Sequence, residues 1–402
     1  MRKITLCCLI PFSYLHELNV SPYKATFNNL TKNFGNIFLI NTEYLTNNKI
    51  KLKKYKNIGK NFKLKNPKNY KDLNNFIPGK KVIIINSIPR TLEFFILLLY
   101  LTIKKIPKIE ISNLGNIQKG TEDFMGKFNS KFLKTAFLKS LPRKIIHLFA
   151  ALGLISKVDC RFTSHKNIYE RFHSYGVIRK SLIYYKNTKH VKSNLYELKE
   201  NKKLTEKYIV LIDAFPLYAQ VTSYKSINLK EIEEHYIKLN SLLNYLKKIY
   251  KKDIAVCIHP AYSQKFYSKY LSEHKVYKYR TVEFIKKSNI ILTYRSSAIV
   301  NAIKYNKKII SIESEIFKWK EYSSYIYEKA LNTKTLRLKN RYNFNPKKLL
   351  LELEKKVRNY KKYKVNHLGI ELKNSASKDV SNYIVSNYDS KYLKNEKFNI
   401  NI

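Results

Sequence analysis

A histidine stands where the chain leaves an apolar segment. His259 and Pro260 directly follow the run Ile254 to Ile258, which has the length and composition of a buried strand. In parallel sheets, ligands bind beyond the carboxyl ends of the strands, where backbone amides and helix starts are exposed. An imidazole at such a position can donate a hydrogen bond to a phosphate and neutralise a leaving group. The position favours chemistry on a phosphate-bearing substrate.

A pair of hydroxyls opens an expected helix later in the same half of the chain. Ser296 and Ser297 stand between an expected strand at Ile290 to Thr293 and an expected helix at Ala298 to Tyr305. One interpretation makes either serine an ordinary N-cap. The other makes the two hydroxyls, neighbouring Arg295 and the first-turn amides a phosphate cradle without a glycine-rich loop. The sequence leaves both interpretations open.

The order and spacing of these two pairs resemble a known family. Bacterial sialyltransferases and polysialyltransferases of the two-Rossmann GT-B type carry a His-Pro motif followed some 40 residues later by a Ser-Ser motif. The resemblance covers residues 208–313 in motif order and the two-domain layout more loosely. It implies that His259 contacts the phosphate of a CMP-activated sugar and assists departure of CMP. It implies that Ser296 and Ser297 bind the same nucleotide, and we expect Pro260 and Arg295 to contact that nucleotide as well.

The resemblance also implies the reaction. Sialic acid or a related sugar would pass from the CMP-sugar co-substrate to a glycan or glycolipid acceptor, by an inverting displacement. No metal and no other cofactor is required if the histidine and the serine-helix start neutralise the departing phosphate. Serines at a helix start serve other donors too, so a transferase that uses another nucleotide sugar or a CDP-glycerol-type polyol phosphate is the alternative.

The family's third motif, an acidic pair followed by glycine, is matched imperfectly. Its carboxylate deprotonates the acceptor hydroxyl. After the expected strand Lys108 to Ile111, which contains Glu110, the chain reads SNLG and lacks the second acid. We take Glu110 as the base. Glu122 or Asp123 in that role, or a changed activity, are the alternatives, and a surface carboxylate paired with a lysine is the non-catalytic interpretation.

A further carboxylate, Asp213, follows the expected strand Tyr208 to Ile212 and is expected to face the cleft. It could hold a sugar hydroxyl or act as an alternative base. Equally, it could stabilise the turn before Pro216, because aspartate side chains often bond to nearby backbone amides. Both roles stay open.

The charge of the chain points to an anionic partner. The 402 residues carry 78 Lys and Arg against 29 Asp and Glu, a net charge of +49. Nucleic acid, an anionic membrane and a phosphorylated substrate would all be attracted. Only 11 of the 78 are Arg, and the chain is rich in Lys, Asn, Ile and Tyr, so A/T-rich codon usage is the other explanation. A basic nucleic-acid-binding protein is the alternative of another class, disfavoured because the 33 tyrosines are dispersed and no nucleic-acid-binding motif occurs.

The sequence predicts neither a metal site nor a membrane-spanning helix. The four cysteines form no CxxC pair, and no histidines have ligand spacing. The longest apolar run, Phe94 to Leu101, is far shorter than the roughly 20 residues of a spanning helix. The segment Phe132 to Ile155 mixes apolar residues with lysine and arginine. This composition is typical of a helix that lies in the headgroup plane of a membrane. It is equally typical of an amphipathic helix pair that covers the core of its own domain. We expect a cytoplasmic protein, peripheral at the inner face of a bacterial membrane.

The surrounding elements alternate between strand-like and helix-like patterns in both halves, which is typical of parallel sheets with helical crossovers. Further expected strands lie at 4–10, 36–40, 81–86, around 276 and at 308–312, and further helices at 23–34, 91–105, 229–250, 262–271, 281–287 and 346–363. The polar stretch Asn187 to Glu206 lacks apolar periodicity and predicts a linker.

The predicted fold class is therefore α/β, of the GT-B type, with two Rossmann-like domains whose parallel sheets face a cleft. Residues 1–190 would form the N-terminal acceptor domain, with the possible membrane-surface segment 132–155. Residues 207–365 would form the C-terminal nucleotide-sugar-binding domain, and residues 366–402 a C-terminal extension.

Overall fold

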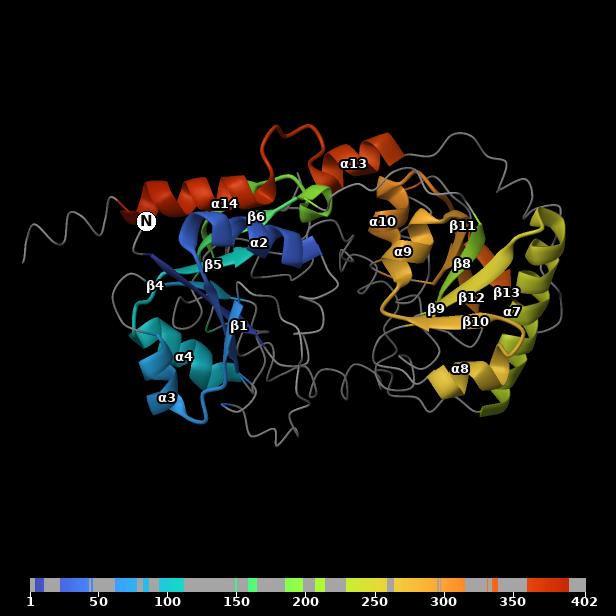
Figure 1. Ribbon diagram of the computed structural model, residues 1–402, viewed down its shortest axis with the longest axis horizontal. Helices are drawn as coiled ribbons and strands as arrows, with labels where there is room; N and C mark the ends of the chain where they lie inside the picture. Colours follow the sequence, from blue (N-terminus) through green and yellow to red (C-terminus); the bar gives the residue numbers. More distant parts are fainter. Residues whose placement is uncertain are drawn as a thin grey trace, which may run out of the picture. The chain divides into compact units, whose positions relative to one another are not determined.

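The structure, a computed structural model, describes two compact units of the chain (Figure 1). The residues described are 4–10, 22–42, 45, 62–77, 82–86, 94–111, 149, 158–164, 185–197, 207–213, 229–258, 264–294, 296, 298–314, 331, 335–338 and 360–389. Unit 1 comprises Met1–Gly115, Gly120–Lys199 and Asn366–Ile402, and unit 2 comprises Asn116–Lys119 and Glu200–Val365. The end of the chain thus belongs to the same unit as its beginning.

Seven described strands of unit 1 form one parallel sheet in the order β3-β2-β1-β4-β5-β6-β7. Their bounds are β1 Thr5–Ile10, β2 Ile37–Asn41, β3 Phe62–Lys65, β4 Val82–Asn86, β5 Lys108–Ile111, β6 Val158–Thr163 and β7 Tyr185–His190. The central strands are nearly continuous aliphatic runs because a parallel sheet is covered on both faces. The strand order reverses at β1, so the unit is doubly wound, with its switch point between β1 and β4.

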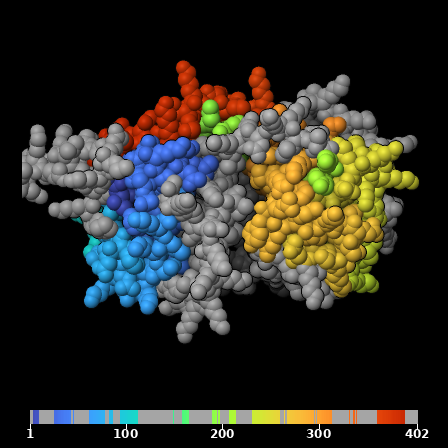
Figure 2. Space-filling view, viewed as in Figure 1, coloured from blue at the N-terminus to red at the C-terminus, as the bar shows by residue number. Residues whose placement is uncertain are grey.

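Helices cover both faces of this sheet (Figure 1). Leu6 and Cys8 of β1 pack on the face of α2 and α14, and Cys7 and Leu9 pack on the face of α3 and α4, as the alternation of side chains along a strand requires. The bounds are α2 Pro22–Phe34, α3 Tyr70–Phe76, α4 Phe95–Ile103 and α14 Ala376–Ile384, with a 3₁₀ helix Asn194–Glu197 and a π-helical turn Val385–Asp389. In Figure 2, the red surface of α14 borders the blue surface of α2, and Asn33 Nδ2 donates to Ser381 Oγ there.

The linker predicted for Asn187 to Glu206 is wrong over its first residues. β7 runs to His190 and pairs in parallel with β6, and Val191 and Leu195 beyond it are buried. β7 is the last strand of the sheet, so it needs little of the apolar pattern that marks a central strand. The short strand β3 and helix α3 likewise lie in a stretch rich in lysine and asparagine, outside the elements expected from the sequence.

Six described strands of unit 2 form a second parallel sheet in the order β10-β9-β8-β11-β12-β13. Their bounds are β8 Tyr208–Asp213, β9 Asp253–Ile258, β10 Lys275–Lys278, β11 Ser288–Thr293, β12 Lys308–Ser314 and β13 Thr335–Leu338. The order reverses at β8, which places the switch point of this unit between β8 and β11. The alternating pattern of the sequence predicted all of these strands but β13, within a few residues.

The long helix α7, Leu229–Tyr250, covers one face of this second sheet. Its buried residues recur every three or four positions, which makes one apolar stripe along the helix. The buried residues are Ile232, Tyr236, Leu239, Leu242, Leu243 and Leu246, together with the polar His235. The other described helices of unit 2 are α8 Gln264–Tyr270 beside α7, and α9 Thr281–Lys286 and α10 Ile299–Lys304 on the opposite face (Figure 1). The helix α13 Tyr360–Leu368 begins in unit 2 and ends in unit 1.

Two expectations fall largely on residues that are not described. Of the segment Phe132 to Ile155, the structure describes Phe149, and of the helix expected at 346–363 it describes the last four residues, which begin α13. In the part of the chain that is described, no helix combines the length and hydropathy that a membrane span requires.

Candidate functional site

The carboxyl ends of three neighbouring strands of unit 2 lie at one level. Asp213, the last residue of β8, pairs with Ile258, the last residue of β9. Thr293, the last residue of β11, pairs with Ile212 of β8. Because β8 lies between β9 and β11, the chain leaves all three strands at the switch point of the sheet. Open α/β sheets bind their ligands at this point.

The sequence motifs begin at these strand ends. His259 is the residue after Ile258, and Ser296 is the third residue after Thr293. The register therefore brings the starts of both motif loops to the same edge of one sheet. Several predicted residues lie outside the described ones: His259, Pro260, Arg295, Ser297, Glu122 and Asp123.

Ser296 takes part in the turn that leads into α10. Its Oγ accepts a hydrogen bond from the amide of Ala298 at 3.3 Å, and its carbonyl oxygen accepts one from the amide of Ile299 at 3.2 Å. Ala298 occupies the N-cap position and has no side-chain cap of its own. Ser296 stands two residues before the cap, so its hydroxyl supports the turn that leads into α10, and the interpretation of Ser296 as the N-cap itself is wrong.

Asp213 is fully buried beneath α7. It lies on the same face of β8 as Ile209 and Leu211, because side chains alternate along a strand. Its Oδ2 accepts a hydrogen bond from the Tyr236 hydroxyl at 2.9 Å. Burial, and next the charge of Asp213, raise the pKa of Tyr236 well above its usual value, so Tyr236 remains a protonated donor. In this position the carboxylate fixes the end of β8.

His235, the residue before Tyr236 on α7, contacts the residue that follows β11. The hydroxyl of Tyr294, which follows β11, lies 2.8 Å from Nε2 of His235. Burial, assisted by the charge of Lys238, lowers the pKa of His235 to about 3, so the imidazole is neutral near pH 7. Two consecutive residues of α7 therefore hold the ends of the two strands that flank the switch point. We call Asp213, Tyr236, His235 and Tyr294 the α7 clamp.

The sequence did not single out three members of this clamp, namely His235, Tyr236 and Tyr294. The only available signal was a polar His-Tyr pair at the start of an otherwise apolar helical stripe. A polar residue on a buried helix face implies a hydrogen-bond partner, but the pattern does not say which strand supplies it.

Glu110, the expected base, is the penultimate residue of β5 in unit 1. It pairs in register with Arg161 of β6, and its Oε1 lies 3.6 Å from the Arg161 Nε. The Glu110 side chain is 18% exposed and the Arg161 side chain is 10% exposed. The partner is an arginine in a largely buried pair, which differs from the exposed lysine pair of the non-catalytic interpretation. The carboxylate keeps partial access to solvent near the carboxyl end of its strand.

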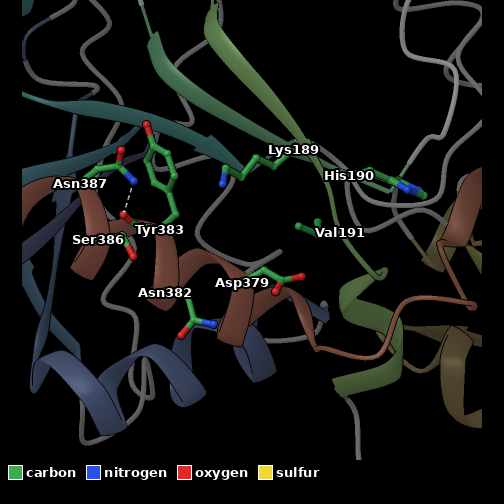
Figure 3. Close-up of a pocket in the computed structure, with 8 residues that line it drawn as sticks. All are labelled: Lys189, His190, Val191, Asp379, Asn382, Tyr383, Ser386 and Asn387. Atoms are coloured by element: carbon green, nitrogen blue, oxygen red, sulfur yellow. Dashed lines mark hydrogen bonds between the residues drawn. The ribbon is translucent and has the colours of Figure 1, made fainter.

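Unit 1 also has a hollow of about 280 Å³ between the end of β7 and α14 (Figure 3). Its lining residues are Lys189, His190, Val191, Asp379, Asn382, Tyr383, Ser386 and Asn387. Asn387 Nδ2 donates to the carbonyl of Tyr383, and the Lys189 ammonium lies 5.2 Å from the centroid of the Tyr383 ring. These contacts tie the lining side chains to one another. None of the described site residues that the sequence predicted lines this hollow.

No metal centre is evident in the described parts of the two units. There, no three His, Cys, Asp or Glu side chains gather closely enough to hold an ion. The four cysteines are buried thiols. That the reaction proceeds without a metal or other cofactor stays a prediction.

Comparisons with known proteins identify the fold. No protein-family model and no curated protein matches the sequence. Os79 from O. sativa, solved in complex with UDP, is similar in structure with a TM-score of 0.52 at 10% identity, over 96% of this chain and 100% of that one. An enzyme from Listeria monocytogenes assigned as a UDP-N-acetylglucosamine 2-epimerase has a TM-score of 0.53 at 10% identity, over 97% of this chain and 98% of its own. The chain has the predicted α/β architecture of the GT-B type, with two parallel sheets.

Proposed function

We propose that this GT-B chain is a glycosyltransferase that binds a nucleotide-activated sugar at the carboxyl edge of unit 2. The observation that carries the proposal is the strand register, in which Asp213 and Ile258 end adjacent strands at one level and β11 ends beside them. A phosphate at this edge can be approached from the loops that start with His259 and Ser296. The two structural relatives, whose descriptions name UDP and a UDP-sugar, support a nucleotide site in this fold.

The donor in our proposal is a CMP-activated sialic acid or a related sugar, and the acceptor is a membrane-attached surface glycan. The support is the resemblance of His259-Pro260 and Ser296-Ser297 to the motifs of bacterial sialyltransferases. The protein would be cytoplasmic and peripheral at the inner face of a bacterial membrane.

The reaction follows from the roles of these residues. Glu110 accepts the proton of the acceptor hydroxyl, and the acceptor oxygen forms a bond to the anomeric carbon on the face opposite CMP. The bond between that carbon and the phosphate oxygen breaks, and its electron pair leaves with CMP. His259 donates to the phosphate, with Ser296 and Ser297 bonded to the same nucleotide. Such positioning and charge neutralisation supply the rate enhancement, with inversion at the anomeric carbon.

Asp213 acts as a positioning residue in this scheme. Its carboxylate is fully buried and bonded to Tyr236, so it lies out of reach of an acceptor sugar. A general base must come within hydrogen-bond distance of the proton that it removes. The partly exposed Glu110 meets this requirement better.

The test is the His259→Ala variant. Loss of a group that assists the leaving phosphate should lower the release of CMP from CMP-sialic acid by about 10²- to 10⁴-fold, with an unchanged melting temperature. His274→Gln is the matched control, because His274 directly precedes β10 and so lies at the opposite, amino edge of the same sheet. Near-wild-type turnover by His259→Ala would reject the proposed role.

A second donor class is favoured by the relatives themselves, since their descriptions name UDP and UDP-N-acetylglucosamine. A ligand that binds only the folded protein raises its melting temperature with concentration and affinity. We expect CMP to raise the melting temperature more than UDP or GDP at equal concentration. Stabilisation by UDP alone would replace the CMP-sugar with a UDP-sugar and leave the transferase proposal in place.

A further inference from the structure

We infer that the outer face of α4 in unit 1 docks on an anionic membrane surface. α4 has the sequence FILLLYLTI, so it is apolar on every side. Leu97, Leu98 and Leu101 are buried against the sheet, whereas Ile96 is 64% and Ile103 is 68% exposed. A helix that only covered a sheet would carry polar residues on its outer face.

The exposed isoleucines form one stripe. Ile96 and Ile103 are seven positions apart, and half-buried Leu99 and Tyr100 lie between them at helical spacing. Residues separated by three, four and seven positions share one face of an α-helix. The stripe therefore runs the length of α4, and it is apolar apart from the Tyr100 hydroxyl, which donates to Asn74 Oδ1 at 3.2 Å.

Lysines border this stripe. Lys104 and Lys105 are exposed at the end of α4, and Lys71 is exposed on α3. α3 lies alongside α4, since the rings of Tyr70 and Tyr100 are 5.4 Å apart. The one acid of α3, Asp72, accepts a hydrogen bond from the amide of Lys68. The surface is thus apolar in its centre and positive at its border, which complements an anionic leaflet.

The lysines favour a bilayer over a protein partner. Protein–protein interfaces are depleted of lysine at their centre, whereas helices that lie in the membrane interface combine an apolar face with bordering lysines. A second observation extends the surface: the ring of Phe149 lies 5.8 Å from that of Phe95. Phe149 belongs to the range 132–155, which the sequence marked as a candidate membrane-surface segment, and this one described residue of that range lies beside the start of α4.

The first experiment measures binding of the full chain to phosphatidylcholine vesicles with and without phosphatidylglycerol, at physiological salt. We expect the double variant Ile96→Ser with Ile103→Ser to bind the anionic vesicles about tenfold more weakly, because it removes two aliphatic side chains from the lipid contact. Ile237→Ser is the control, since Ile237 is 66% exposed on α7 of unit 2. Its binding should stay within about twofold of wild type.

A charge comparison separates this surface from the general positive charge of the protein. Lysines near an anionic leaflet each strengthen binding about fivefold. Lys71→Gln with Lys104→Gln should therefore weaken vesicle binding about 25-fold. Lys247→Gln with Lys248→Gln, two exposed positions at the end of α7, makes the same charge change in unit 2 and should have a smaller effect.

Insertion gives the sharpest readout. In a Trp319→Phe background, which removes the single native tryptophan, Ile96→Trp should be quenched by lipids brominated on their acyl chains, and Ile237→Trp should not. Equal quenching of the two, or unchanged vesicle binding by the double serine variant, would overturn the inference. A change from dimer to monomer in that variant without a change in vesicle binding would assign the face to self-association instead. Turnover with a soluble acceptor should be unaffected, so a failure here would leave the proposed transferase function untouched.

Discussion

The two units share one strand order over six strands, but their described residues support the two switch points differently. α2 and α7 have the same place in the chain, each between the first and second strand of its unit. In unit 1, the strands that flank the switch point are backed by aliphatic side chains and a thiol, namely Leu6, Cys8, Ile83 and Ile85. In unit 2, the α7 clamp adds hydrogen bonds to the ends of the corresponding strands, β8 and β11.

This difference indicates which unit needs a fixed edge. Burying a carboxylate costs folding free energy unless the group is hydrogen-bonded. The hydrogen bond between Tyr236 and Asp213 also has a preferred direction, whereas apolar packing has none. Hydrogen bonds from two consecutive helix residues hold β8 and β11 at a defined separation. A site in which loops from several strands must grip one phosphate benefits from such rigidity. Our account therefore assigns donor binding to unit 2 and the acceptor base to unit 1.

The largest expected effect tests this division directly. Glu110→Gln should lower sugar transfer by about 10²- to 10⁴-fold, because the acceptor hydroxyl loses its base. Binding of CMP, measured by calorimetry, should not change. Glu371→Gln, at an exposed glutamate of the same unit, is the control. A normal rate of sugar transfer by Glu110→Gln would contradict this role and favour Glu122 or Asp123 as the base.

The next effect concerns stability and the clamp itself. Tyr236→Phe removes the hydrogen bond to the buried carboxylate of Asp213 and should lower the free energy of unfolding by about 2 to 3 kcal/mol. Tyr294→Phe removes a bond between two neutral groups and should cost about 1 kcal/mol. Urea unfolding of both variants measures the two values. The opposite ranking would mean that Asp213 does not depend on Tyr236.

A smaller effect appears in the pH dependence of stability. The pKa of His235 is lowered to about 3 in the folded protein, so between pH 6.5 and 5 the unfolded chain binds the proton that the folded chain excludes. Stability should therefore fall as the pH falls through this window, and the contribution of this residue approaches about 1.4 kcal/mol per pH unit at the acid end. His274, whose pKa burial also lowers, adds to the same trend. His235→Gln should flatten the profile more than His274→Gln does, and equal slopes would contradict the burial of a neutral His235.

Much of this fold could be predicted from the sequence because central parallel strands carry their own signal. Apolar runs that end at a polar residue predicted β8, β9 and β11, and the apolar stripe at 229–250 gave α7 with its observed bounds. Edge elements gave no such signal, since β3 and β7 are polar and each pairs on one side only.

The α7 clamp could not be predicted because it depends on which strands become neighbours. His235 and Tyr294 are 59 positions apart, and only the strand order brings them within 2.8 Å. The packing of α14 on α2 is of the same kind, since it joins the two ends of the chain within unit 1. Local patterns fix the elements, whereas long-range pairing decides which polar groups meet.

The central claim is that the carboxyl edge of unit 2 holds the donor nucleotide. A crystal structure of the full chain soaked with CMP tests it most directly. We predict that the phosphate lies between the loop of His259 and the start of α10 at Ser296, above the ends of β8 and β11. Cytidine density elsewhere, with this edge occupied by solvent, would contradict the account.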